Sequence, residues 1–384
     1  MHNIIVNNYS KHIAIIGAGI SGLALGLILK KANIPVVIFE KSNDISDYGA
    51  GISISSNGIK VLKYLNIYDE VIAFSKNPKE AVYFSGNKKI NNFIVDVITT
   101  SRQTLYKVLY SNYKQLDGEI LFNHQLNDID TNRLEINFTG NKSYKVNHIV
   151  ACDGIKSSCR KKIDSNKDPL YSGYSVWRAI VDKKQENIKT YLGTNHHIVS
   201  YPITNSKVSF VAAVKTSGNY QESWRTAGTY AELRNDLCHS NHEFFSFINE
   251  KTPLFKWGVY IRPPVKNLVY KNLTFLGDAA HPIVPFIGQG GCLALEDAYV
   301  FGNLLIKYHS DIHKAQNLYE SLRLERIKKI SNLSLRQGFL NHLSNPLLVF
   351  LRNFIMKFFP YFAMRSIKSN VWNYDPKHYI DNYE

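Results

Sequence analysis

A glycine-rich turn between an apolar strand and a helix, close to the start of the chain, limits the possible folds most. The segment 13–16 is apolar and β-branched, which predicts a buried strand. The run Gly17–Gly22 (GAGISG) follows directly, a helix is expected over 23–31, and a second apolar strand over 35–40. Together these segments predict a βαβ unit, and therefore an α/β protein with parallel strands.

Each glycine of this turn has its own physical task. Gly17 permits the tight turn from strand to helix, Gly19 lets the backbone approach a pyrophosphate, and Gly22 lets helix and strand pack closely. The helix N-terminus offers free N–H groups and a partial positive charge to phosphates. Glu40 ends the next strand, where its carboxylate can accept both ribose hydroxyls of an adenosine. The unit therefore predicts a dinucleotide site.

Two further motifs follow downstream. In the run 149–160 (IVACDGIKSSCR), an apolar strand leads into Asp153-Gly154 and a basic, serine-rich turn. In the run 276–291 (LGDAAHPIVPFIGQGG), a strand ends in Gly277-Asp278, where a short acid can bond a ribityl or ribose hydroxyl. The glycines from Gly288 onward open a helix whose N-terminus could stabilise an anion, such as the negative charge of a reduced flavin.

These three motifs, in this order, resemble the fingerprints of the single-component FAD monooxygenases typified by p-hydroxybenzoate hydroxylase. The resemblance extends from about residue 12 to residue 336. It implies an α/β fold with a Rossmann-like FAD-binding domain, an interleaved antiparallel-sheet substrate domain and a C-terminal helix. The expected FAD-binding domain comprises residues 1–75, 95–168 and 268–338, the substrate-binding domain residues 76–94 and 169–267, and the C-terminal helical segment residues 339–384.

The resemblance also implies the chemistry. NADPH or NADH would reduce FAD as a transient partner, which agrees with the lack of a second G-x-G-x-x-G motif in the sequence. Reduced FAD would capture O₂ as a C4a-hydroperoxide that oxygenates a planar phenolic or enolic substrate. Because the flavin performs the chemistry, no side-chain nucleophile or other catalytic side chain is expected.

Matched position by position, the resemblance implies a set of cofactor-binding residues. They are Gly17, Gly19, Ile20, Ser21, Gly22, Glu40, Lys41, Arg102, Asp153, Asp278, Pro285, Gly288, Gly290 and Gly291. Arg178, Arg225 and Arg262 are candidates for holding an anionic or enolic substrate. No metal site is expected, because His196-His197 lack further ligands at a suitable spacing and are interpreted as exposed strand or loop residues.

Chain length and the apolar, basic segment 346–368 make the sequence similar in architecture to the tetracycline-inactivating monooxygenases, called tetracycline destructases. Tetracycline inactivation, and with it antibiotic resistance, is therefore the expected activity. The alternative is a catabolic hydroxylase of a small aromatic acid, because the run 173–178 (GYSVWR) resembles the substrate-domain start of salicylate and 3-hydroxybenzoate hydroxylases. A third reading is a protein whose FAD is structural or redox-sensing, with a partner or membrane bound through the C-terminal helix.

Charge and cysteine content indicate which partners and which cellular compartment to expect. The formal net charge is +15, but the sequence carries no nucleic-acid-binding signature, and a lysine-rich surface is the preferred explanation. The segment 346–368 contains four basic residues and a proline, which argues against stable membrane insertion. Four scattered cysteines predict reduced thiols and a cytoplasmic protein. A small-molecule substrate, O₂ and a monomeric or dimeric state are expected.

Overall fold

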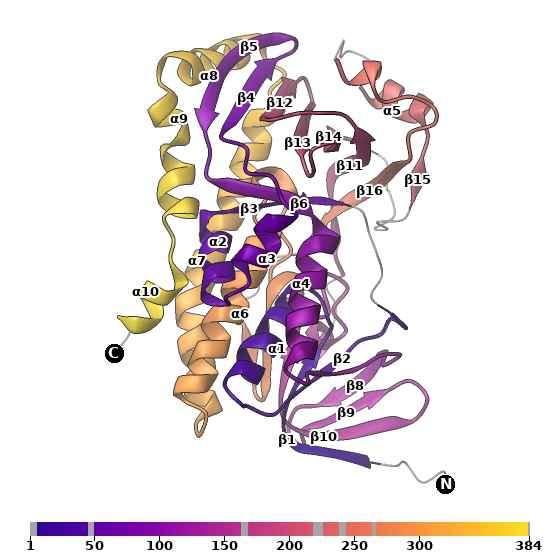
Figure 1. The fold of residues 1–384 in the computed structure, drawn as a ribbon, viewed down its shortest axis with the longest axis vertical. Helices are drawn as coiled ribbons and strands as arrows, with labels where there is room; N and C mark the ends of the chain where they lie inside the picture. Colours follow the sequence, from indigo (N-terminus) through magenta and orange to yellow (C-terminus); the bar gives the residue numbers. More distant parts are fainter. Residues whose placement is uncertain are drawn as a thin grey trace.

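The computed structural model describes residues 6–44, 50–162, 168–217, 226–237, 243–262 and 266–382. Two large sheets lie one above the other in Figure 1, and the last helices run along one side of both. The mixed α/β architecture confirms the predicted fold class.

The first sheet is built on the predicted βαβ unit. Its central strands run parallel. In order, the strands are β17 (Val269–Tyr270), β18 (Leu273–Phe275), β10 (Lys142–Ala151), β1 (Val6–Ile16), β2 (Val36–Phe39) and β7 (Glu119–Leu121), and the antiparallel strands β9 (Glu135–Phe138) and β8 (Leu126–Asp130) continue from β10. Because these strands are covered on both faces, β2 and the end of β10 are buried along their length, as the continuous apolar runs predict.

Helices pack around this sheet. They are α1 (Ile20–Lys31), α2 (Ser56–Tyr64), α3 (Tyr68–Ala73), α4 (Arg102–Gln115) and α6 (Gly290–Lys307). Every residue of α1 from Ile20 to Leu29 is buried, because α4 and α6 pack against it. The sequence predicts a helix over 100–113 with Thr100 or Ser101 as its cap, and the structure confirms Ser101, whose hydroxyl accepts the N–H of Thr104 at 3.0 Å.

The second sheet is antiparallel at every pairing except one. Its order is β15 (Ala227–Gly228), β16 (Leu254–Ile261), β11 (Leu170–Asp182), β14 (Lys207–Lys215), β13 (His196–Pro202), β12 (Ile188–Gly193), β4 (Glu80–Ser85) and β5 (Lys88–Ile94). The exception is the parallel pairing of β12 with β4, which inserts the early hairpin β4–β5 beside strands far along the chain. Apolar side chains on one face of this sheet pack with α5 (Tyr230–Asp236) and form a hydrophobic core separate from that of the first sheet.

Alternation along each strand gives this sheet a second, distinct face. On β13, His197, Val199 and Tyr201 line a cavity, whereas Ile198 packs in the core on the other side. On β11, Arg178 lines the cavity and Trp177 is fully buried in that core. Successive strand side chains point to opposite faces, so one sheet supplies both a core and a cavity wall.

The C-terminal helices complete the fold. They are α7 (Ile312–Asn341), α8 (Pro346–Phe358), α9 (Pro360–Ile367) and α10 (Pro376–Asp381), with a π-helical turn over Lys368–Trp372. The expected single helix over 346–368 is two helices, separated at Phe359 and joined at a bend of 94°. Pro360 causes the break, because it cannot donate to the preceding turn and its ring would clash there.

One segment differs from the sequence interpretation. The sequence over 49–65 predicts a loop that leads into a helix, but Gly51–Ser55 forms strand β3, paired antiparallel with β6 (Val97–Ser101). The alternating Ile52 and Ile54 carry the strand pattern, which the neighbouring serines and glycine obscure. This short sheet lies between the two large ones and reaches the cavity.

Candidate cofactor and substrate site

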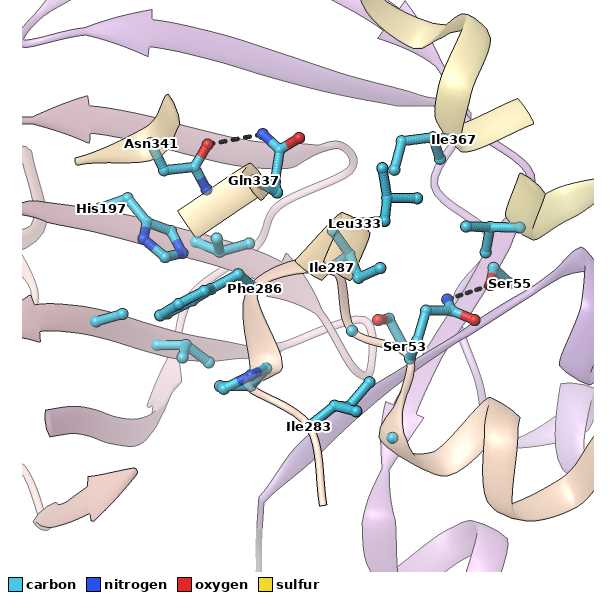
Figure 2. Close-up of a pocket in the computed structure, with 18 of the residues that line it drawn as sticks. Ser53, Ser55, His197, Ile283, Phe286, Ile287, Leu333, Gln337, Asn341 and Ile367 are labelled. Carbon is cyan, nitrogen blue, oxygen red and sulfur yellow. Dashed lines mark hydrogen bonds between the residues drawn. The ribbon is translucent and has the colours of Figure 1, made fainter. Parts of the chain in front are cut away.

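A cavity of about 1300 Å³ lies between the two large sheets and the C-terminal helices. The turns of the three motifs form one end, the inner face of the second sheet forms a wall, and α7, α8 and α9 close the opposite side. Figure 2 shows this arrangement, with Phe286 and His197 on one side and Leu333 and Ile367 on the other.

The three sequence motifs converge at one end of the cavity. Gly17 has a φ of +104°, and a Cβ placed there would lie 2.5 Å from the carbonyl oxygen of Cys152, next to Asp153. Gly277 has a φ of +58°, and its Cβ would lie 2.9 Å from Oγ of Ser21. The turns therefore touch one another through positions that admit only glycine.

Two glycines at this end are open to the cavity instead. A Cβ on Gly19 or on Gly290 would meet no protein atom within 4 Å, and both residues line the cavity. Gly19 caps α1 and Gly290 begins α6, so two helix N-termini meet the same space. Their unpaired N–H groups and partial positive charges suit an anionic ligand.

Gly288 and Gly291, unlike Gly19 and Gly290, lie close to other protein atoms, namely side chains of strand β3. The Cβ of an alanine at Gly291 would lie 2.9 Å from the side chain of Ile52, and Gly288 has a φ of +65° beside Ser53. Gly22 lies against the Gly17 carbonyl, as the close packing of strand and helix requires. These glycines shape the walls of the cavity.

Glu40 lies at the glycine turn, as its place in the sequence predicts. Its carboxylate accepts the backbone N–H of Ala18 at 2.8 Å and that of Ser42 at 2.9 Å. Lys41 and Arg102 both line the cavity. The backbone N–H of Arg102 donates to Ala50, which ties the start of α4 to the segment before β3 at 2.7 Å.

The two aspartates of the later motifs have different surroundings. Asp153 is half-buried at the cavity wall and accepts the backbone N–H groups of Ser158 at 2.8 Å and Cys159 at 3.1 Å. Burial raises its pKa, although those bonds oppose the shift. Asp278 lies exposed at the cavity edge, so its carboxylate is accessible to a ligand hydroxyl. Pro285, Ile20 and Ser21 also line the cavity.

The three candidate arginines do not meet at one place. Arg178 lines the cavity, donates to the Gly51 carbonyl at 3.2 Å and stacks over the Trp257 ring at 5.2 Å. Burial lowers its pKa from the ordinary arginine value. Arg262 instead donates from Nε to the Ile155 carbonyl at 2.8 Å and is not among the cavity-lining residues. Arg225 lies outside the described residues.

A buried histidine pair lies at the cavity, with His197 in its lining and His342 beside His197, and the sequence interpretation missed it. His196 and His197 are buried, not exposed, and Nδ1 of His197 lies 2.7 Å from Nε2 of His342. Burial lowers the pKa of His197 to about 3, and burial together with His197 lowers that of His342 to about 2. The alternation 197, 199, 201 on β13 was the available signal, but the partner on α7 is distant in sequence.

A buried polar network lies behind the cavity. Gln289 donates to Ser55 at 2.8 Å (Figure 2), and Asn57 joins it to Glu296 on α6 at 2.9 and 2.7 Å. Arg323 of α7 contacts both Glu296 and Asp297, at 2.7 and 2.8 Å. The network fixes α6, whose N-terminus opens on the cavity, against β3, α2 and α7.

This fold and site agree with the comparison to known families. The family model described as "FAD binding domain" matches residues 10–333, which is most of the chain. The protein therefore belongs to this family of p-hydroxybenzoate hydroxylase-like flavin monooxygenases. The expectation of an FAD-binding protein of this class is confirmed.

One curated relative is the 3-amino-4-hydroxybenzoate 2-monooxygenase PtmB3 of Streptomyces platensis, which is 26% identical and covers 88% of this chain and 90% of its own. A salicylate hydroxylase substrate complex superposes with a TM-score of 0.80 at 21% identity, over 97% of each chain. Tetracycline destructase Tet(55) superposes with a TM-score of 0.73 at 17% identity, over 94% of this chain and 97% of its own. Both structural likenesses establish the fold.

Proposed function

We propose that the protein is an NAD(P)H- and O₂-dependent monooxygenase that oxygenates a planar phenolic or enolic compound in the cavity between its two sheets. The observation that carries the proposal is the continuity of this cavity. It runs from two helix N-termini, which suit an anionic cofactor, to the largely apolar face of the second sheet, which suits a flat organic substrate.

The residues at the motif end fit FAD. The space at Gly19 and Gly290 is free of protein atoms, and the α1 N-terminus with Lys41 can hold the pyrophosphate. Glu40 and Asp278 would accept ribose and ribityl hydroxyls, and the α6 N-terminus would stabilise negative charge on the ring. When bound, FAD supplies the electron transfer and oxygen activation. In this proposal NADPH or NADH visits transiently.

The chain itself binds, orients and shields the substrate. Trp257, Val259 and Phe286 give the cavity apolar walls that exclude water. Arg178 offers a buried positive charge for an acidic or enolic oxygen. His197 has one ring nitrogen engaged by His342, so its Nε2 is left to form a hydrogen bond with a substrate hydroxyl. Burial lowers the pKa of both histidines and keeps them neutral near pH 7, so His197 would orient this hydroxyl and would not take up its proton.

Small hydroxylated aromatic acids are the first candidate substrates. The 26% identical relative acts, by its name, on an aminohydroxybenzoate, and Arg178 provides a carboxylate partner within the cavity. Tetracycline is the second candidate. The observation favouring it is that α8 and α9 add a further wall to a large cavity, in a fold shared with Tet(55).

The proposed division of labour follows the domain boundaries expected from the sequence. Residues 1–75, 95–168 and 268–338 would hold the cofactor, and residues 76–94 and 169–267 would supply the substrate wall. Residues 339–384 would close the cavity.

The test is NADPH and NADH consumption by purified, FAD-loaded protein with salicylate, 3-hydroxybenzoate or tetracycline, followed by mass spectrometry. A substrate should accelerate NAD(P)H consumption and gain the mass of one oxygen atom. Stimulation by a benzoate without effect of tetracycline would assign the first candidate, and the reverse result the second. Purified protein that takes up no FAD would overturn the proposal.

A further inference from the structure

The apolar side chains of α8 and α9 are exposed, while a charged one is buried. Arg352 is the one buried residue of α8, and α9 has none. Phe350 is 65% exposed, Phe358 58% and Tyr361 74%. An ordinary surface helix shows the reverse distribution, with its apolar stripe on the core and its charges in water.

The exposed side chains form one continuous row. Phe350, Phe354 and Phe358 follow at helical spacing, and their ring centroids are 6.2 and 4.9 Å apart. Phe359 adds a ring at 6.1 Å from Phe354. We call Phe350, Phe354, Phe358, Phe359 and Tyr361 the outer row.

The outer row does not belong to the cavity. None of its residues lines that space, whereas Leu348, Leu351 and Ile355 on the other side of α8 do. The inner side therefore has an assigned role and the outer row has none. In Figure 1 both helices stand at the outside of the molecule, against the hairpin β4–β5. Exposed aromatic patches of this kind mark interaction surfaces.

The positive charge of this region favours an anionic partner. From residue 327 to residue 374 the sequence contains no Asp or Glu. It contains Lys328, Lys329, Arg336, Arg352, Lys357, Arg365 and Lys368. Lys357 and Lys368 are exposed and lie outside the cavity lining, and Lys357 lies over the Phe358 ring of the outer row at 5.3 Å. A second copy of the chain would bring this basic surface against its like, whereas an anionic surface complements it.

The length and composition of α8 and α9 suit helices that lie in a membrane interface. No single helix among the described residues is long and apolar enough to cross a bilayer. Pro346–Phe358 and Pro360–Trp372 reach that length and composition only together, across their 94° bend. Aromatic side chains with flanking lysine and arginine are the composition of helices that lie in the interface between headgroups and acyl chains.

We propose that the outer row and its flanking basic residues dock the protein on anionic lipid surfaces, with α8 and α9 lying in the interface. This docking does not depend on the catalytic proposal. It would place the lipid on the far side of the helices that wall the cavity.

The experiment is flotation of the FAD-loaded full chain with vesicles of phosphatidylcholine alone or mixed with phosphatidylglycerol. The protein should float with the mixed vesicles, remain soluble with the neutral ones, and be released by high salt. The double variant F350S/F358S should lose flotation. The control F74S changes a phenylalanine that is 68% exposed after α3 and should float like the wild type.

A charge variant gives an independent test. K357E/K368E should weaken binding to the mixed vesicles by at least about tenfold, since each basic residue at an anionic surface contributes about a fivefold factor. K251E, in the loop before β16, should bind like the wild type. Bound FAD, read from its absorbance, verifies that each variant is folded.

Two results would overturn the proposal. One is absence of flotation with mixed vesicles by a protein that retains its FAD. The other is a wild-type dimer in sedimentation velocity that F350S/F358S dissociates, without any vesicle binding, because a second copy would then cover the outer row. Neither result depends on NAD(P)H consumption, so failure of the docking and failure of the proposed reaction are separate.

Discussion

His197 Nδ1, in the cavity wall, and His342 Nε2 lie 2.7 Å apart, and burial keeps both imidazoles neutral. Their folded pKa values lie below the ordinary 6.5, so in mild acid the unfolded chain binds protons that the folded chain does not. The stability that these histidines retain above pH 6.5 is therefore lost as the pH falls toward about 3.

We expect the wild type to lose about 2 to 3 kcal/mol more free energy of unfolding than H197N/H342N between about pH 7.5 and about pH 5.5. Urea unfolding at both pH values measures the difference. The variant H378N, which removes an exposed histidine, should keep the wild-type pH dependence. Equal pH dependence in wild type and double variant would show that the two imidazoles take up protons over the same pH range in the folded chain as in the unfolded chain.

The buried ion pairs of α7 predict a large effect on stability. Arg323 is fully buried, and its guanidinium contacts Glu296 at 2.7 Å and Asp297 at 2.8 Å. Burial opposes their ionisation, but the charges of Arg326, Arg323 and His281 hold both carboxylate pKa values below the ordinary range, to about 2 for Asp297. R323A leaves two buried carboxylates without this partner and should lower the free energy of unfolding by about 3 to 5 kcal/mol.

The matched control lies on the same helix. Lys328 and Glu325 form an exposed pair at 2.7 Å, so K328A should change stability by less than about 1 kcal/mol. Chemical unfolding of both variants measures the contrast. Similar losses for R323A and K328A would mean that the network contributes little.

Gly19 and Gly17 provide a test that separates cofactor binding from folding. An alanine methyl at Gly19 meets no protein atom within 4 Å, so G19A should change the stability of the FAD-free protein by about 1 kcal/mol at most. The methyl occupies ligand space, however, and FAD affinity should fall by about tenfold to a hundredfold. G17A should destabilise the FAD-free protein itself, because its Cβ would lie 2.5 Å from the Cys152 carbonyl at a φ of +104°. Flavin fluorescence titration and urea unfolding distinguish the two. Unchanged FAD affinity in G19A would place the pyrophosphate elsewhere.

Local patterns predicted the parts of the fold that depend on local physics. The turn 17–22, the Ser101 cap and the helix α6 follow from glycine conformation, hydroxyl capping and apolar periodicity, and each is present. Alternating segments such as 198–203 and 207–214 likewise predict an antiparallel sheet, and these segments pair that way in the structure. By contrast, no local pattern indicates that β12 pairs with β4 in parallel, because that contact joins segments far apart in sequence.

The same distinction between local sequence patterns and long-range contacts applies to the site. Positions near Gly17, Asp153 and Asp278 could be named from their motifs because each motif is a short run of contiguous residues. His342 could not, since only the tertiary packing of α7 against β13 brings it to His197. Arg178 and Arg262 look alike in sequence, but Arg178 lies within β11 and lines the cavity, whereas Arg262 follows the end of β16 and donates to the Ile155 carbonyl.

This difference between the two arginines gives a prediction about substrate binding. Arg178 holds its position through the Gly51 carbonyl and the Trp257 ring, which use the planar fork of the guanidinium. R178K keeps the charge but loses both contacts, so we expect KM for an acidic substrate to rise about tenfold or more, with FAD content unchanged. R262K, outside the cavity lining, should leave KM near the wild-type value. Steady-state NAD(P)H consumption against substrate concentration measures both, and an equal rise in KM in both variants would exclude Arg178 as a specific partner of the substrate.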